Sequence, residues 1–405
     1  MRRHRLPSLS SLPLLLGFAT AQVAPLLPER VGRIRSLLQA EVENGHHAGL
    51  SFVVWRRGEL VAEGAFGQMD VDKGRPLRRD TIVRLYSMSK PITAVAALTL
   101  VEQGKLRLEQ RVAELLPEFA TPSVFTGGTA EAPEIRPAKV AITVRMLLNH
   151  TAGFTYDFFR DSPLHEIYRR ADLWSSRSTR EFVQKAAALP LYAEPGTAWN
   201  YSIADDVLGA LIERVAEQPL DAYVREHVTG PLGMTDTGYD VPPGQMGRVA
   251  TLHRTEQGKL ITMEPTFGVF AEAGRGFAAG GAGMFSTLDD YARFGRFLLG
   301  DGSLDGKRVL SRRTMELART NSLRDGQRTS RPGDGWGLIA AVCVDPGAGT
   351  DLMSAGTVHW SGAATTTFFA DPTEQLVAVL FAQHQPYDEH KLVSRFRTAV
   401  YQALP

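Results

Sequence analysis

The chain has 405 residues, of which 43% are hydrophobic and 22% charged, and its 45 Lys and Arg against 44 Asp and Glu give a net charge of +1. This composition excludes the disordered and fibrous classes, and the length predicts two or three compact units. Without a basic excess, neither nucleic acid nor an anionic membrane is expected as a partner. The single cysteine, Cys343, excludes an intrachain disulfide, and its apolar neighbours indicate a buried packing residue.

Residues 1–27 are read either as a secretory signal or as a flexible extension. A basic start, an apolar stretch at 12–18 and small residues at 19–21 are the three parts of a signal, whereas Pro7 and Pro13 interrupt the apolar part. Export and a cytoplasmic location therefore both stay open. No other segment approaches the about 20 apolar residues that a membrane span requires, so no membrane partner is expected.

The next segments alternate between helix and hairpin signals. Apolar side chains recur at helical spacing over 28–44, and Gly45 then ends the helix. Residues 49–67 predict a hairpin around a turn at 56–58. An Ala- and Leu-rich helix is expected from Pro91 to Gly104.

The middle of the chain is predicted to be mostly helical. Capping residues and apolar periodicity predict helices over 178–189, 202–218 and 286–300. Polar stretches rich in Gly at 119–142 and 321–335 predict loops. Strand character returns only near the C-terminal end.

Three strands are expected there, over 336–345, 364–371 and 375–383, followed by a helix over 390–404. A hairpin at one end of the chain and strands at the other predict an α+β fold. In it, both chain ends build one antiparallel sheet that is flanked by the terminal helices, and the centre of the chain forms a helical lobe.

The expected domains are a sheet domain of residues 28–90 and 330–405 and a mainly helical domain of residues 91–329. A ligand site is expected where these two domains meet.

Ser87, Met88, Ser89 and Lys90 form a Ser-x-x-Lys tetrad ahead of the helix that Pro91 begins. One interpretation is capping, because Ser favours the helix N-cap. The other is nucleophilic catalysis: the hydroxyl of Ser87 and the amine of Lys90 face the same side of one turn, and a desolvated lysine can take the proton of the serine. Chance alone gives on the order of one such tetrad in a chain of this length.

Two further stretches carry polar chemistry. Tyr201 precedes a helix and is either a packing residue or, beside a lysine, a phenolate base or proton relay. The strand with Ser361, Gly362 and Ala363 is either an ordinary strand with a bulge at its glycine or a pocket edge. As a pocket edge, its glycine allows a close backbone approach and one of its backbone N–H groups binds an oxyanion.

In this order, the Ser-x-x-Lys, Tyr and Trp-x-Gly motifs resemble those of the serine β-lactamase-like superfamily over about residues 30–400. More narrowly, the chain resembles the family VIII carboxylesterases, which share the fold of class C β-lactamases and DD-peptidases. The stretches MLLNHTAGF, PLGMTDTGY and GGAGMFSTLDDYARF occur in the order that the family has.

The resemblance implies a role for each matching residue. Ser87 is the acylated nucleophile with Lys90 as its partner, and Tyr201 with Lys90 shuttles the proton to the leaving alcohol. The backbone N–H groups of Ser87 and Ala363 form the oxyanion hole. The substrate-binding strand is formed by Trp360, Ser361 and Gly362.

Two departures from the family's β-lactamases favour esters over lactams. In those β-lactamases the Tyr motif resembles Tyr-x-Asn, and Ile203 takes the place of its Asn. Their strand motif resembles Lys-Thr-Gly, and Trp360 takes the place of its Lys. Both changes remove polar groups that hold a β-lactam. The sequence therefore predicts a serine carboxylesterase for short-chain esters. The alternatives are a β-lactamase or DD-peptidase, an acyltransferase, or a binding protein that has lost turnover.

The remaining candidates are weaker. No Gly-x-Ser-x-Gly is present, which argues against an α/β-hydrolase. His150 is expected to be structural, and the role of His359 and the oligomeric state stay open. Without a Cys/His cluster or an H-E-x-x-H, neither a metal nor another cofactor is expected.

Overall fold

The computed structural model describes residues 26–265 and 277–405. Its largest sheet has eight strands, and every neighbouring pair is antiparallel. Their spatial order is β12 (Asp334–Trp336), β13 (Ala341–Cys343), β14 (Val358–Gly362), β15 (Thr366–Asp371), β16 (Leu376–Phe381), β1 (Gly49–Arg56), β2 (Glu59–Asp70) and β3 (Arg75–Pro76). Ser51 of β1 lies opposite Phe381 of β16, so strands from the two ends of the chain are joined at the middle of the sheet.

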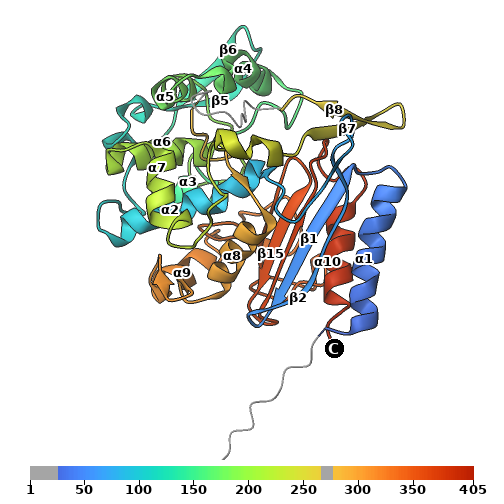
Figure 1. Cartoon of the computed structure of the whole chain (residues 1–405). Helices are drawn as coiled ribbons and strands as arrows, with labels where there is room; N and C mark the ends of the chain where they lie inside the picture. The colour runs from blue at the N-terminus through green and yellow to red at the C-terminus, as the bar shows by residue number, and fades with distance from the viewer. Residues whose placement is uncertain (1–25, 266–276) are drawn as a thin grey trace, which may run out of the picture.

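Helices cover both faces of this sheet (Figure 1). The helices α1 (Pro28–Glu43) and α10 (Leu392–Tyr401) lie on one face, and α8 (Leu288–Leu299) lies on the other. Along β1, Phe52 packs at 6.0 Å from Phe396 of α10, while its neighbour Val53 belongs to the apolar cluster of the other face. Because both faces are covered, β16 is apolar at every position, which differs from the alternation of a half-exposed strand.

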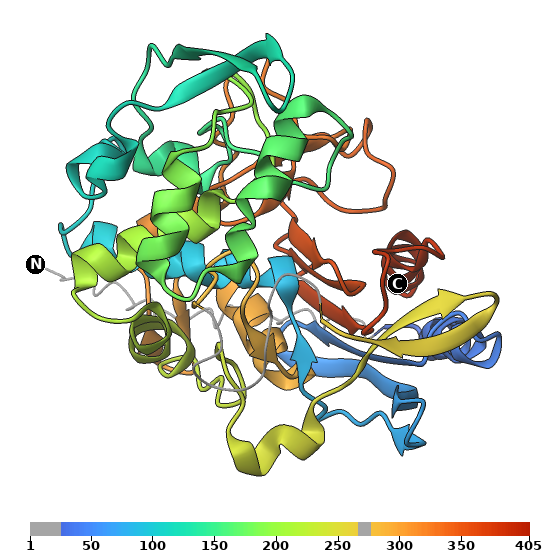
Figure 2. The same cartoon turned by 90° about the horizontal axis from the view of Figure 1, so that it is seen from above.

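The middle of the chain forms the second, mainly helical lobe, seen from above in Figure 2. Its helices are α2 (Lys90–Glu102), α3 (Val144–Leu148), α4 (Pro163–Ala171), α5 (Thr179–Ala187), α6 (Ala204–Ala216) and α7 (Leu220–Val224), and α9 (Arg312–Arg319) follows α8. All residues of α2 from Lys90 to Leu100 are buried, which explains why apolar residues occur on every side of this helix, with Lys90 as the one charged residue among them.

Among the described residues, short two-stranded ribbons complete the fold. They are β4 (Val83–Arg84) with β9 (Phe285–Ser286), β5 (Ser123–Gly128) with β6 (Pro133–Pro137), β7 (Leu252–Glu256) with β8 (Lys259–Met263), and β10 (Ser303–Leu304) with β11 (Lys307–Arg308).

The predicted α+β fold is confirmed: one antiparallel sheet is built from both chain ends, flanked by terminal helices and joined to a helical lobe. Three local predictions were wrong. The predicted loop at 119–142 contains the β5–β6 ribbon, and strands β7 and β8 lie in the middle of the chain, where none was expected. The predicted strand at 336–345 is divided between β12 and β13 by a turn. Ribbons with exposed faces lack the apolar alternation on which strand prediction depends.

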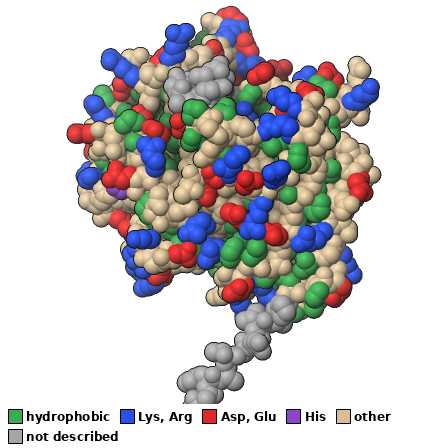
Figure 3. Space-filling view, in the orientation of Figure 1, with side chains coloured by type: hydrophobic (Ala, Val, Ile, Leu, Met, Phe, Trp, Pro, Cys, Tyr) green, Lys and Arg blue, Asp and Glu red, His purple; other side chains and the backbone are tan. Residues whose placement is uncertain are grey.

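The division of the chain at residues 90 and 330 stays a prediction, and the signal-like features of residues 1–25 lie outside the described residues. Within the described part of the chain, no helix is both long enough and apolar enough to cross a bilayer. On the face shown in Figure 3, basic and acidic side chains are interspersed, in keeping with the balanced charge of the sequence.

The packing of β1 against α10 gives a test of the sheet core. We expect Phe52→Ala to lower the free energy of unfolding by about 3–5 kcal/mol, because it leaves a cavity beside Phe396. Ile135→Ala, at an apolar position that is 52% exposed, should change it by less than about 0.5 kcal/mol. Urea titrations of the two variants would compare these values, and equal effects would contradict the assignment of Phe52 to the core.

Candidate active site

Ser87 lies on the short 3₁₀ helix η1 (Tyr86–Ser89), which leads directly into α2. The preceding Tyr86 has a φ of +47°, a left-handed conformation that is rare for a residue with a side chain. Ser89 stands at the N-cap of α2 but makes no capping hydrogen bond; its Oγ accepts from the backbone N–H of Met284 at 3.0 Å. The capping interpretation of the tetrad was therefore wrong; Ser87, and not Ser89, lines the cavity of about 420 Å³ described below.

Lys90 places its amine next to the hydroxyl of Ser87. Its side chain is only 1% exposed, and Nζ lies 3.4 Å from Ser87 Oγ. Nζ also donates to the carbonyl oxygen of Gly281 at 2.8 Å and to the phenolic oxygen of Tyr156 at 2.9 Å. The amine therefore has three hydrogen-bonding neighbours, namely Ser87, Gly281 and Tyr156. The amine is thereby held at a defined position beside the serine.

Tyr201 lies next to the pair formed by Ser87 and Lys90. Its ring face lies 4.7 Å from Lys90 Nζ, and its phenolic oxygen accepts a hydrogen bond from Trp360 Nε1 at 3.1 Å. Burial raises the pKa of Tyr201, while the charge of Lys90 and hydrogen bonds with Lys90, Ser87 and Trp360 act in the opposite direction. Because the net shift is upward, Tyr201 carries its proton at neutral pH, which favours the relay over the resting phenolate.

A buried carboxyl group lies behind the lysine. Asp206 Oδ1 accepts from the backbone N–H of Gly281 at 2.8 Å, and the carbonyl of the same Gly281 binds Lys90. A Cβ atom at Gly281 would lie 2.6 Å from Asp206 Oδ2, so only glycine allows this approach. Burial raises the pKa of Asp206 to about 6, although Lys90 opposes the shift. Asp206 is thus a positioning residue for the Lys90 amine.

His150 supports the tyrosine from behind. It is completely buried, its Nε2 lies 3.2 Å from Asp205 Oδ2, and its ring lies 4.7 Å from that of Tyr201 and 4.9 Å from that of Trp336. Burial, followed by the charge of Lys90, holds the pKa of His150 well below its usual value. A neutral histidine packed between aromatic rings fits the structural role expected from the sequence.

The strand β14 forms the wall opposite Tyr201. A Cβ atom at Gly362 would lie 2.1 Å from the carbonyl oxygen of Leu85, just before η1. The glycine therefore permits a close approach to the backbone that carries the nucleophile, and the continuous pairing of β14 with β15 contains no bulge. Ala363, the next residue, lines the same cavity as Ser87, whereas the Ser361 hydroxyl donates to Thr367 Oγ1 at 3.0 Å.

The cavity over Ser87 has a volume of about 420 Å³. Most of the predicted site residues line it, namely Ser87, Tyr201 and residues 360–363. Phe158 and Phe159 add further aromatic walls. A neighbouring cavity of about 500 Å³ shares Phe159, Tyr201 and Trp360 with it. Lys90 does not line either cavity and reaches the site through its bond to Ser87.

One end of the cavity is polar and contains His359. Its Nε2 lies 3.0 Å from Asp334 Oδ2, and its Nδ1 lies 3.3 Å from an Nη atom of Arg397, which also pairs with Asp351 at 2.8 Å. Burial lowers the pKa of His359 to about 4, so the ring is neutral at pH 7. The buried ion pairs hold His359 in place at the cavity wall.

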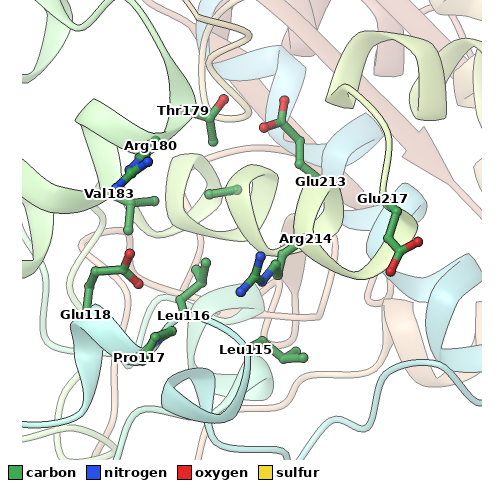
Figure 4. A pocket seen from close by; sticks show the side chains of 11 residues that line it. Leu115, Leu116, Pro117, Glu118, Thr179, Arg180, Val183, Glu213, Arg214 and Glu217 are labelled. Atoms are coloured by element: carbon green, nitrogen blue, oxygen red, sulfur yellow. The ribbon is translucent and has the colours of Figure 1, made fainter.

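A larger cavity of about 710 Å³ lies in the helical lobe, between residues 115–118 and the helices α5 and α6 (Figure 4). Side chains of both charges surround an apolar floor there, and Arg180, Glu213 and Arg214 are among them. It shares no lining residue with the cavity over Ser87. The nucleophile, and not the size, therefore identifies the candidate active site.

Tyr156, Asp206 and Gly281 are functional residues that the sequence analysis missed. Gly281 lies in the stretch GGAGM, which was noted only as a family-like segment. Tyr156 and Asp206 carried no signal of their own, because an isolated tyrosine or aspartate is common in any chain. Cys343 is buried as expected, and burial raises the pKa of its thiol to about 11, which excludes a reactive thiolate at neutral pH.

Comparisons with known proteins place the chain in a family. The family model described as "Beta-lactamase" matches residues 34–402. Protein Rv1367c of Mycobacterium tuberculosis is 36% identical over 349 residues, covering 84% of this chain and 86% of its own length. Esterase EstB of Burkholderia gladioli is 31% identical over 395 residues, covering 91% and 94%.

Among solved structures, one described as "EstCE1, a hydrolase with promiscuous acyltransferase activity" is similar, with a TM-score of 0.79 and 28% identity. The similarity covers 92% of this chain and 99% of that one. The resemblance on which the sequence analysis relied is thereby confirmed over nearly the whole chain.

Asp206 gives a test by its dependence on pH. Because its pKa is higher in the folded protein, the folded state binds a proton that the unfolded state has released between about pH 4 and pH 6. Stability from this group is therefore lost as the pH rises through that window. Asp206→Asn keeps an acceptor for Gly281 and should gain stability relative to wild type between pH 4 and pH 7.

Urea unfolding at pH 4, 5.5 and 7 would measure this difference. Asp325→Asn, at an exposed position, serves as the control. A constant difference between Asp206→Asn and wild type across the three pH values would contradict the assigned pKa.

Proposed function

Because the chain belongs to the beta-lactamase family, we propose that it is a serine carboxylesterase that hydrolyses uncharged short-chain esters through an acyl-enzyme on Ser87. The observation that carries this proposal is the buried Lys90 amine, held 3.4 Å from a serine hydroxyl at the edge of an aromatic cavity. The relatives support the ester class, since EstB is an esterase and EstCE1 a hydrolase.

The hydrogen bonds at Lys90 suggest how Ser87 is activated. A neutral amine has two N–H donors, which Gly281 and Tyr156 accept, and one lone pair, which is then left for the hydroxyl proton of Ser87. Ser87 Oγ attacks the ester carbonyl as its proton passes to Nζ. The carbonyl oxygen becomes an oxyanion, and the backbone N–H groups of Ser87 and Ala363 bind it.

Tyr201 completes the proton transfer. The C–O bond of the ester breaks, the leaving alkoxide takes the proton of the Tyr201 phenol, and Lys90 returns its extra proton to the tyrosine. The acyl group is then on Ser87, and all protons are accounted for. In the second half, water takes the place of the alcohol and the same groups act in reverse. Trp360 Nε1 donates to the phenolic oxygen and stabilises its brief negative charge.

The walls of the cavity favour an uncharged ester over a β-lactam. Ile203 is 1% exposed and packs in the core, so it offers no amide group to the site. Trp360 covers the position where a lysine would hold a carboxylate. Acyl transfer to an alcohol is the second candidate, because it uses the same acyl-enzyme with an alcohol in place of water, and EstCE1 is described with such an activity.

Replacing Ser87 tests the nucleophile. Ser87→Ala should lower kcat/KM for p-nitrophenyl acetate by roughly 10⁴-fold or more, since no acyl-enzyme forms. A fluorophosphonate should label wild type on Ser87, as mass spectrometry of the digested protein would show. Ser89→Ala is the matched control: it loses only the bond to Met284 and should still be labelled. An adduct on Ser89, or near-normal activity of Ser87→Ala, would refute the mechanism.

A substrate panel tests the reaction class. With p-nitrophenyl esters of increasing acyl length and with the lactam nitrocefin, the short esters should have the higher kcat/KM, because the site lacks groups that hold the lactam carboxylate. Added alcohol should yield a new ester if acyl transfer competes with hydrolysis, and product analysis by chromatography would measure it. A preference for nitrocefin would overturn the esterase assignment in favour of a lactamase.

A further inference from the structure

Four of the ten histidines of the chain lie together outside the active site. His46 and His47 follow α1, whereas His384 and His390 lie on the connection from β16 to α10. The ring centroids of His46 and His390 are 4.4 Å apart, and the ring of His47 lies 5.1 Å from His384 and 5.4 Å from His390. Imidazole groups at this density are unusual for a packed surface, because each must find hydrogen-bond partners.

The donor atoms of this cluster have the separations of a metal site. One donor atom from each of His384, Glu389 and His390 lies within 4.8 Å of the other two. Glu389 Oε2 is 2.9 Å from His384 Nε2 and 3.8 Å from His390 Nε2. Ligands at about 2.0–2.2 Å from a tetrahedral ion are about 3.3–3.6 Å apart, so small side-chain rotations would bring these atoms onto one ion.

Buried ring nitrogens without hydrogen-bond partners also support a metal site. His47 is 1% exposed; its Nδ1 faces Glu41 Oε2 at 3.6 Å, and its Nε2 has no hydrogen-bond partner in the described structure. His390 likewise leaves its Nε2 without a hydrogen-bond partner in the described structure. A buried polar atom without a partner costs free energy, and a bound cation would remove that cost.

We propose that His384, Glu389 and His390 bind a divalent transition-metal ion such as Zn²⁺, with His47 beside them as a further ligand. Two or three imidazoles with one carboxylate are the donor set that Zn²⁺ takes in proteins.

Two neighbouring groups suit such a site. Glu41 Oε2 lies 3.6 Å from His47 Nδ1. Although Glu41 is not one of the proposed ligands, its carboxylate would orient the His47 ring. Access comes from the solvent side, since the side chains of Glu389 and His390 are 36% and 23% exposed.

The site would also brace the active site. The N–H of His384 donates to the carbonyl oxygen of Ala364 at 3.1 Å, and the N–H of Asp388 donates to Thr365 Oγ1 at 3.0 Å. Both acceptors directly follow the oxyanion residue Ala363. Tyr387, from the same connection, lines the cavity over Ser87. An ion that ties His384 to His390 would therefore hold this turn and the cavity wall in place.

Titration of the chelator-treated full chain with ZnCl₂, by calorimetry and by thermal unfolding, tests the proposal. Wild type should bind one equivalent and unfold at a higher temperature with Zn²⁺, because the ion binds the folded state. His390→Ala and Glu389→Gln, both at solvent-accessible positions, should each weaken binding by about tenfold or more. His227→Ala removes another histidine beside a glutamate, 3.8 Å from Glu226, and should bind as wild type does.

Circular dichroism of the metal-free variants would establish that each one folds. The absence of saturable Zn²⁺ binding by wild type would overturn the proposal, and so would equal affinity in wild type, His390→Ala and Glu389→Gln. These readouts do not depend on esterase activity, so the metal site and the proposed function can fail separately.

Discussion

The burial of one amine determines the arrangement of the active site. Lys90 is 1% exposed, and a group of this kind can be taken out of water only if its hydrogen bonds are replaced. Gly281 and Tyr156 supply two of them, and the third direction is left for Ser87. Each partner imposes a further condition: Gly281 must be a glycine next to Asp206, and α2 must begin where Pro91 allows it.

The location of these groups explains why both lobes are needed. Ser87, Lys90 and Tyr156 come from the segments before and within the helical lobe, whereas Trp360 comes from β14 and Ala363 from the turn that follows it. The contact between the two parts is close: Gly362 of β14 lies against the carbonyl of Leu85 with no room for a side chain. A rigid backbone contact of this kind fixes the separation between β14 and the segment that carries Ser87, as the proposed oxyanion hole requires.

The parts of the site that could be predicted are those with a local pattern. The spacing of Ser87 and Lys90 and the order of Tyr201 and Trp360 after them are visible in one sequence, and the sheet follows from strand signals at both ends. Asp206 could not be predicted, because its role depends on a backbone N–H far away in the chain. The histidines were missed for the same reason: His47 and His384 become neighbours only when β1 pairs with β16.

The pairing of β1 with β16 has a consequence for the folding of the chain during its synthesis. When Lys90 has been translated, β1 has no neighbour at one edge until the last strands are made, roughly 15–60 s later at the usual rates of synthesis. During that time an open strand edge is exposed to other nascent chains. The proposed oxyanion hole is also incomplete during that time, because Ala363 has not yet been added. A prematurely terminated chain therefore exposes an unpaired strand edge and lacks part of the proposed active site.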